Sequence, residues 1–204
     1  SFTGGVAAGL EVTRRAGLKK LGMELGSNSP VLALDDCDLD AAVESCVSGA
    51  FWAAGQNCIG VQRLYVQEGI FEAFRDAFVA RTLRYKVGPK LDDDCDMGPL
   101  ITEAEACRVE AWVEEARAVG ARVECGHRRE RAAYWPTVLT GVPDGARVGC
   151  DEVFGPVVSL WPIRDLEEGI ARANAVDYGL HAAVFTRSLA AAMKAVEELE
   201  AGGV

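Results

Sequence analysis

The stretch VQRLYVQEGIFEAFRDAFVARTL, residues 61–83, places a β-strand directly before an α-helix. Residues 61–66 alternate in the manner of a strand, whereas residues 71–83 carry apolar side chains at helical spacing. The same order recurs along the chain, with helices of about ten to fifteen residues between short strands. We therefore predict an α/β fold, a layered domain with a largely parallel, twisted sheet flanked by helices.

Further strands and helices follow from the same periodicities, and turn residues separate them. Asp38 can cap a helix from residue 39, whose apolar positions recur until Gly55 and whose C-terminal end should point at Cys58. Gly120 is suited to a left-handed cap after another helix. In chain order the expected elements are helix 6–16, strand 21–25, strand 31–34, helix 39–55, helix 103–119, a strand from 123, strands 135–139 and 157–162, helix 166–174, strand 182–186 and helix 189–199.

Composition limits the classes of partner. The chain of 204 residues is 50% hydrophobic, which is enough for one core and about one domain. Its formal net charge is -10, so a nucleic acid would be repelled rather than exchange its counterions for lysine and arginine. No apolar run approaches the roughly 18 to 20 residues that a membrane helix needs. We expect neither a nucleic acid nor a membrane as a partner.

Cysteine and histidine usage disfavours a metal site. The seven cysteines show no Cys-x-x-Cys spacing, and the two histidines, His127 and His181, lack partner spacing and should be structural or surface residues. We expect reduced thiols in a cytoplasmic protein, with every cysteine except Cys58 as a small buried apolar residue. The acidic loop 92–96 lacks the glycine that a calcium loop needs at its sixth position. The basic residues 128–131 should form a solvated turn.

Three loop segments carry side chains suited to chemistry: Glu24-Leu25-Gly26, Gly55-Gln56-Asn57-Cys58 and Glu152-Val153-Phe154-Gly155-Pro156-Val157. A cysteine is a nucleophile as thiolate, which needs an exposed turn, and Gly55 favours one before Cys58. Glu24 follows an apolar run, so partial desolvation would suit it to take a proton near neutrality. Each has a plainer interpretation: Cys58 as a buried apolar residue, Glu24 as exposed or paired with a lysine, and Glu152 and Phe154 as surface and core residues beside a turn.

These segments, in this order and at about this spacing, resemble those of the catalytic half of the aldehyde dehydrogenases. The resemblance implies NAD(P)-dependent oxidation of a small-molecule aldehyde to a carboxylate. Cys58 would attack the carbonyl to give a thiohemiacetal, whose collapse expels hydride to the nicotinamide and leaves a thioester. The main-chain N–H of Cys58 would help to hold the oxyanion, and Glu24 would activate the water that hydrolyses the thioester.

The resemblance also implies NAD or NADP as the cofactor and assigns residues to it. Glu152 matches a carboxylate that hydrogen-bonds the nicotinamide ribose, since a carboxylate offers only acceptors to two vicinal hydroxyls. Phe154 matches an aromatic ring that packs against the flat nicotinamide. The remaining matches, beside the dinucleotide phosphates or the nicotinamide, are Gly4, Gly5, Leu25 and Gly26.

By the same resemblance, residues 1–22 would be the C-terminal remnant of a dinucleotide-binding domain, and residues 23–204 a catalytic domain truncated at its C-terminus. The full-length protein would be a homodimer or homotetramer, and residues 1–204 alone would bind dinucleotide poorly. Two other functions stay open. One is a thiol esterase that uses Cys58 and Glu24 without redox chemistry, and the other is a catalytically inactive domain that serves subunit association.

Overall fold

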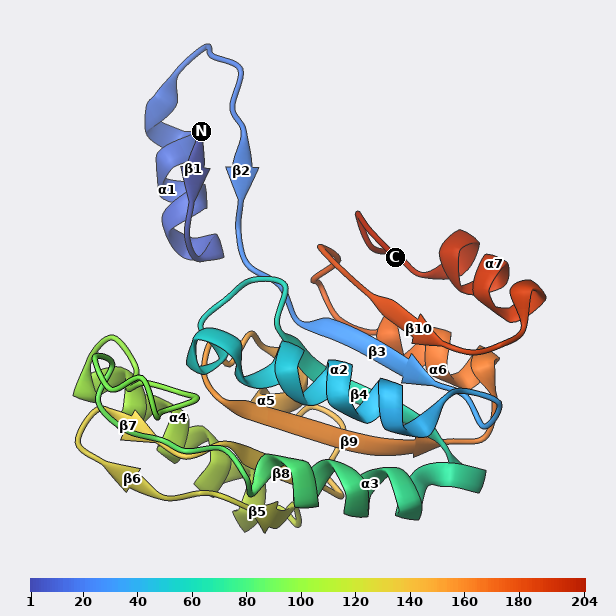
Figure 1. Ribbon diagram of the computed structural model, residues 1–204. Coiled ribbons are helices and arrows are strands. Elements are labelled where there is room, and N and C mark those ends of the chain that lie inside the picture. Colours follow the sequence, from blue (N-terminus) through green and yellow to red (C-terminus); the bar gives the residue numbers. More distant parts are fainter.

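The computed structural model describes residues 1–204, and a six-stranded sheet forms its centre (Figure 1). The strands are β3 Ser29–Ala33, β4 Val61–Gln67, β5 Arg122–Cys125, β8 Thr137–Thr140, β9 Val157–Ile163 and β10 Ala183–Phe185. Their order across the sheet is β10, β3, β4, β9, β8, β5. All neighbours run parallel except β5, which is antiparallel to β8. The predicted α/β class with a largely parallel sheet is confirmed.

Helices cover both faces of this sheet (Figure 1). The helices are α2 Leu39–Phe51, α3 Glu68–Thr82, α4 Glu103–Ala118, α5 Arg147–Cys150, α6 Leu166–Ala173 and α7 Leu189–Glu198. Because successive strand residues point to opposite faces, Leu64 and Val66 pack with α2 and α3 in one buried cluster. Tyr65, between them in sequence, packs in a second cluster with α4, α5, α6 and α7. None of the helices is both long enough and apolar enough to cross a membrane.

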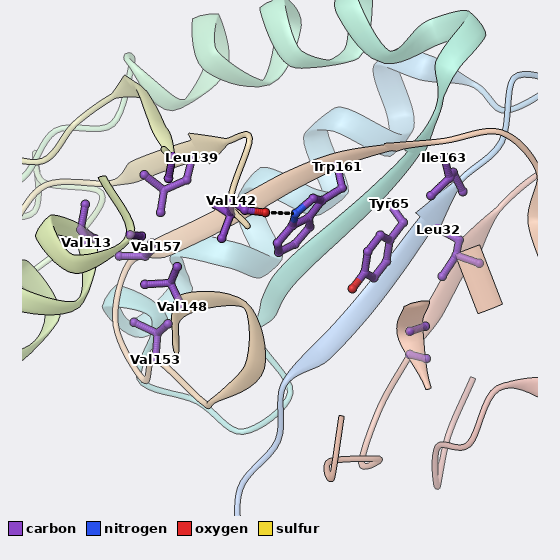
Figure 2. Packing of buried hydrophobic residues seen from close by; sticks show 14 of the residues in the cluster. Leu32, Tyr65, Val113, Leu139, Val142, Val148, Val153, Val157, Trp161 and Ile163 are labelled. Atoms are coloured by element: carbon purple, nitrogen blue, oxygen red, sulfur yellow. Dashed lines mark hydrogen bonds between the residues drawn. The ribbon is translucent and has the colours of Figure 1, made fainter. Parts of the chain in front are cut away.

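Two aromatic rings stand at the middle of the second cluster (Figure 2). The strand register sets Tyr65 of β4 opposite Trp161 of β9, and their stacked rings have centroids 5.4 Å apart. The indole N–H of Trp161 donates a 2.8 Å hydrogen bond to the carbonyl oxygen of Val142, so the buried ring leaves no unpaired donor. Burial of a neighbouring side chain such as Ile163 stabilises the fold by roughly 1.5–3 kcal/mol.

A small unit precedes the sheet and projects away from it (Figure 1, blue). It consists of β1 Phe2–Thr3, α1 Val6–Ala16 and β2 Met23–Glu24, with β1 and β2 paired in parallel. The expected strand 21–25 is thus shorter than predicted. Leu25 instead packs beneath α1, where a Cβ atom on Gly9 would lie 3.0 Å from Leu25 Cδ1. The domain boundary at residue 22 stays a prediction.

The helix that begins at residue 39 ends four residues before the predicted Gly55, at Phe51. Asp38 caps its start as predicted, with its carboxylate accepting a 3.1 Å hydrogen bond from a first-turn N–H. Beyond Phe51, Ala53 and Ala54 take left-handed backbone φ values of 53° and 57°. A right-handed helix cannot continue through such residues, so the prediction of a helix to Gly55 is wrong.

Residues 128–131 are not a purely solvated turn. Arg129–Glu130 (β6) pairs antiparallel with Ala133–Tyr134 (β7), and the Arg129 guanidinium donates a 2.6 Å hydrogen bond to Glu110 of α4. Just before β6, the His127 Nδ1 atom lies 2.8 Å from the Tyr134 hydroxyl. The basic segment is therefore attached to α4 by an ion pair, while His127 has the structural place expected of it.

The cysteines are less buried than the sequence analysis expected. All seven are free thiols, but only Cys46, on α2, is buried. Cys107 is exposed on α4, and the others are half-buried. The prediction that every cysteine except Cys58 is buried is therefore wrong, because most of them lie on loops or at element ends rather than on core faces.

Candidate active site

Loops that precede three neighbouring parallel strands meet at one edge of the sheet. Gly26 lies before β3, Cys58 before β4 and Glu152 before β9, and these strands adjoin one another. Because the strands are parallel, all three loops lie at strand amino ends. Open α/β sheets usually bind ligands at the carboxyl ends, so strand order alone would have suggested the opposite edge.

A pocket of about 230 Å³ lies among these loops and the N-terminal unit. All predicted site residues line it except Leu25, whose side chain packs beneath α1. Thr3 and Leu180 also line it and were missed by the sequence analysis, although Thr3 adjoins the glycine pair that was identified. The lining residues are Thr3, Gly4, Gly5, Glu24, Gly26, Cys58, Glu152, Phe154 and Leu180.

Cys58 lies in a turn and is half-buried, so its thiol reaches the pocket without belonging to the core. Ahead of it, Ala53, Ala54 and Gly55 have φ values of 53°, 57° and 69°. A left-handed conformation costs a residue with a Cβ atom roughly 1–2 kcal/mol. Such strain persists where the surroundings impose it and gathers at functional sites. The surrounding structure therefore imposes the conformation of the turn before Cys58.

Gly55 joins the cysteine loop to the loop that carries Glu152 and Phe154. A Cβ atom on Gly55 would lie 2.9 Å from the backbone nitrogen of Pro156 and closer still to the carbonyl oxygen of Gly155. Neither backbone can move aside as a flexible side chain could. Glycine is thus required at Gly55 both for its positive φ and for this close approach.

Glu152 turns toward the loop that precedes β3. Its Oε1 accepts a 2.9 Å hydrogen bond from the Ser27 N–H, across a separation of 125 residues. Gly26 has a φ of 94°, and a Cβ atom there would lie 3.0 Å from the carboxyl carbon of Glu152. Burial raises the pKa of Glu152, while the Ser27 hydrogen bond and the charge of Arg108 act in the opposite direction. The carboxylate thus keeps an oxygen at the pocket but is partly desolvated.

Phe154 presents its ring at the pocket from an unusual backbone conformation. Its φ is 47°, in the left-handed region, and the residue is 42% exposed. A positive φ is sterically unfavourable for a residue with a large side chain, and exposing an apolar ring to water is also unfavourable. The surrounding fold therefore holds Phe154 in this conformation for a reason other than core packing. The plainer interpretation of Phe154 as a core residue is excluded by its exposure.

Glu24 lies across the pocket from the sheet loops, on β2. Its backbone carbonyl accepts a 3.0 Å hydrogen bond from the Gly4 N–H, which ties β2 to the glycine pair. Within residues 1–204 Glu24 is exposed on a two-stranded pair, so the expected partial desolvation is not seen in this part of the protein. Glu24 nevertheless lines the same pocket as Cys58.

The glycine pair closes one end of the pocket. A Cβ atom on Gly4 would meet the Phe2 ring at 2.7 Å, whereas Gly5 has no such neighbour within 4 Å. Gly5 is the N-cap of α1 and makes no side-chain capping bond, so first-turn N–H groups of this helix stay available to an acceptor. The backbone here is suited to approach by an anionic group.

Two residues that the sequence analysis missed contact the loop of Glu152 and Phe154 from opposite sides. Gln62 of β4 and Arg108 of α4 both hydrogen-bond the backbone of Val153. Gln62 offered one weak sequence signal, since it and Arg63 are polar residues next to the apolar run Leu64–Val66 of the same strand. Arg108 offered none, since arginine is ordinary on a solvated helix.

Comparison with known proteins identifies the family of the chain. The family model described as "Aldehyde dehydrogenase family" matches residues 1–204, and the chain belongs to the aldehyde dehydrogenase family. The resemblance inferred from the three segments is thereby confirmed.

Individual relatives match the whole chain. An aldehyde-dehydrogenase-like protein of Sinorhizobium fredii is 54% identical over 100% of the chain and 40% of its own length. Aspartate-semialdehyde dehydrogenase 1 of Pseudomonas canavaninivorans is 51% identical over 100% of the chain and 43% of its length. The structure of a glyceraldehyde-3-phosphate dehydrogenase of Methanocaldococcus jannaschii, complexed with NADP, superposes with a TM-score of 0.97 at 39% identity, covering 100% of this chain and 44% of that one. The chain spans less than half the length of these relatives.

Proposed function

We propose that residues 1–204 carry the catalytic residues of an NAD(P)-dependent aldehyde dehydrogenase that oxidises a small aldehyde to a carboxylate. One observation carries the proposal: Cys58, Glu24 and Glu152, drawn from three distant segments, line one pocket. Family membership supports the class of reaction. The esterase and scaffold alternatives leave the strained, exposed ring of Phe154 without a role.

Cys58 is the proposed nucleophile. Its sulfur attacks the carbonyl carbon of the aldehyde, a C–S bond forms, and the carbonyl π electrons move to oxygen. The main-chain N–H of Cys58 stabilises the oxyanion as a preorganised donor. The product of this step is a thiohemiacetal held in the turn that Gly55 and its strained neighbours shape.

The pocket fits a nicotinamide dinucleotide by the chemistry of its wall. Glu152 offers carboxylate oxygens to vicinal ribose hydroxyls, and Phe154 offers an exposed aromatic face to a flat ring. Gly4 and Gly5 admit close backbone approach of an anionic group at the start of α1. When bound, NAD or NADP supplies the hydride acceptor for collapse of the thiohemiacetal to a thioester.

Glu24 is the proposed general base. Its carboxylate takes a proton from water, whose oxygen attacks the thioester carbon, and the C–S bond breaks to release the carboxylate product and the Cys58 thiol. We further propose a cytoplasmic location, supported by seven free cysteines, and a homodimer or homotetramer by family resemblance.

The experiment measures aldehyde-dependent NAD(P)H formation by the whole protein that contains residues 1–204. Cys58→Ser should lower kcat by at least about 10³-fold, whereas Cys107→Ser, at an exposed thiol on α4, should leave it unchanged. Glu24→Gln should give a burst of about one NAD(P)H per active site and then stall, because the base acts only after hydride transfer. Full activity in Cys58→Ser would contradict the proposal.

A further inference from the structure

Val153 is held on three sides, midway between Glu152 and Phe154. Its N–H donates a 2.9 Å hydrogen bond to Gln62 Oε1, and its carbonyl oxygen accepts a 2.7 Å hydrogen bond from the Arg108 guanidinium. Its side chain is fully buried in the cluster of Figure 2. The residues before and after it are therefore joined to a fixed point, while they themselves reach the pocket.

Gln62 uses its whole amide group on this loop. Besides accepting from Val153, its Nε2 donates to the carbonyl oxygen of Asp151 at 2.6 Å and to that of Val148 at 3.3 Å. The side chain is 7% exposed, so these bonds replace water that cannot reach it. Gln62 also follows Cys58 by four positions, so one short segment carries the nucleophile and holds the facing loop.

Arg108 of α4 holds the backbone of Val153 from the other side. The hydrogen bonds of Gln62 and Arg108 to Val153 together form what we call the grip. Its Nε donates a 2.7 Å hydrogen bond to Glu105, and its guanidinium stacks 4.8 Å from the centre of the Trp112 ring. These contacts on its own helix fix the direction of the guanidinium before it reaches Val153. Its charge also favours the ionised form of Glu152, by lowering the pKa of that carboxyl group against the effect of burial.

We propose that Gln62 and Arg108 are positioning residues that hold Val153 from two sides and so direct Glu152 and Phe154 toward the dinucleotide. The φ of 47° at Phe154 is the conformation that such a grip maintains, since a released loop relaxes to negative φ and carries the ring away. Neither residue touches the reacting atoms. The proposal rests on the proposed function for its effect on catalysis, but the grip itself does not.

The test substitutes Gln62 by methionine, which keeps the length and loses all three hydrogen bonds. Gln67→Met is the matched control: this glutamine ends the same strand and makes the same kind of bonds, to Asp35 N–H at 2.9 Å and to the Arg164 carbonyl oxygen at 3.2 Å. Gln62→Met should raise KM for the dinucleotide about tenfold or more, because small misplacements of binding groups are costly. Gln67→Met should change it less than about twofold.

A second variant, Arg108→Met, tests the proposal if the Gln62→Met protein fails to fold. Arg108 is partly exposed, so Arg108→Met should fold, raise the dinucleotide KM in the same way, and be partly rescued by Arg108→Lys. Equal KM values in Gln62→Met, Arg108→Met and Gln67→Met would overturn the proposal.

Hydrogen exchange separates this inference from the proposed function. The Val153 amide should exchange at least about tenfold faster in Gln62→Met than in Gln67→Met, whether or not the protein binds a dinucleotide, because its acceptor is gone. An unchanged exchange rate of the Val153 amide would overturn the proposal that Gln62 holds this residue. A parent protein that binds no dinucleotide would overturn the proposed function instead, and faster exchange would still support the grip.

Discussion

Gly55 and Gly155 touch backbone to backbone, so the loop that presents Cys58 and the loop that presents Glu152 share one contact. Any Cβ atom on Gly55 would overlap the Gly155 carbonyl oxygen and approach Pro156 N to 2.9 Å. The two loops lie before β4 and β9, which are neighbours in the sheet. The loop of the proposed nucleophile and the proposed cofactor loop are thereby coupled through a main-chain contact.

Gly55→Ala should therefore destabilise the protein by about 3 kcal/mol, the sum of a positive-φ penalty and a steric overlap that backbone must absorb. Gly145→Ala is the control, since Gly145 has a φ of 84° and no neighbour within 4 Å. It should cost only about 1 kcal/mol. Urea denaturation of both variants checks this, and equal losses would mean that the Gly55 contact yields without strain.

Phe154→Leu should weaken dinucleotide binding roughly two- to tenfold, because a branched side chain lacks the flat face worth about 0.5–1.5 kcal/mol in ring stacking. Phe154→Tyr keeps that face and should bind nearly as well as the parent. The exposed ring contributes little to the core, so both variants should unfold close to the parent midpoint. Fluorescence titration measures the affinities, and equal weakening in both variants would count against a stacking role.

The affinity for the dinucleotide should fall at acidic pH because of Glu152, so the pH profile of binding should have an acidic limb. Burial raises its pKa above the ordinary 4.5, so the carboxylate takes up a proton at a higher pH than an exposed glutamate and loses an acceptor for ribose hydroxyls. Affinity should fall as pH decreases toward this raised value. Glu152→Gln should bind more weakly throughout and show no such limb. A limb that survives in Glu152→Gln would assign it to another group.

The raised pKa of Glu152 makes the folded protein less stable as pH rises. This is the opposite of the effect of a carboxylate whose pKa is lowered by an ion pair. Because the folded pKa of Glu152 exceeds the unfolded value of 4.5, its contribution to stability is lost as pH rises from 4.5 through the folded value. Glu152→Gln should therefore reduce the decline of the free energy of unfolding in that window. Chemical denaturation at a series of mildly acidic pH values measures the slope.

Cys46 should make the protein less stable in alkali. Burial raises its pKa to about 12 from the ordinary 9.0, so between these values the unfolded chain has lost a proton that the folded chain keeps. Stability should fall through this window by up to about 1.4 kcal/mol per pH unit from this group. Cys46→Ala should flatten the decline, whereas Cys107→Ala, at an exposed thiol, should not.

The three motif segments could be recognised in the sequence because their chemistry depends on residue type and local order. Glu152 and Phe154 were assigned in this way, and both line the pocket. The grip on Val153 was invisible, because a glutamine 91 positions away forms it only after two strands pair. Glu24 was expected to be partly desolvated, but its burial depends on what packs against the β1–β2 pair, and within residues 1–204 the residue is exposed.

Local turn geometry shows the same division. Asp38 as a helix cap was predictable, since capping is decided within one turn of the chain. The end of that helix at Phe51 was not, because Ala53 and Ala54 have good helix propensity and yet take left-handed conformations, next to the close approach of Gly55 to the neighbouring loop. Tertiary packing here overrides local preference.

The sequence by itself determined the alternation of strands and helices and the α/β class, and it supplied the residues proposed as nucleophile, base and cofactor contacts, because periodicity and side-chain chemistry are local properties. Only the tertiary structure decided that these residues share one pocket at the amino ends of β3, β4 and β9, that Leu25 packs elsewhere, and that Phe154 is exposed. Those outcomes depend on strand pairing and on backbone contacts between residues far apart in the chain, which no local pattern encodes.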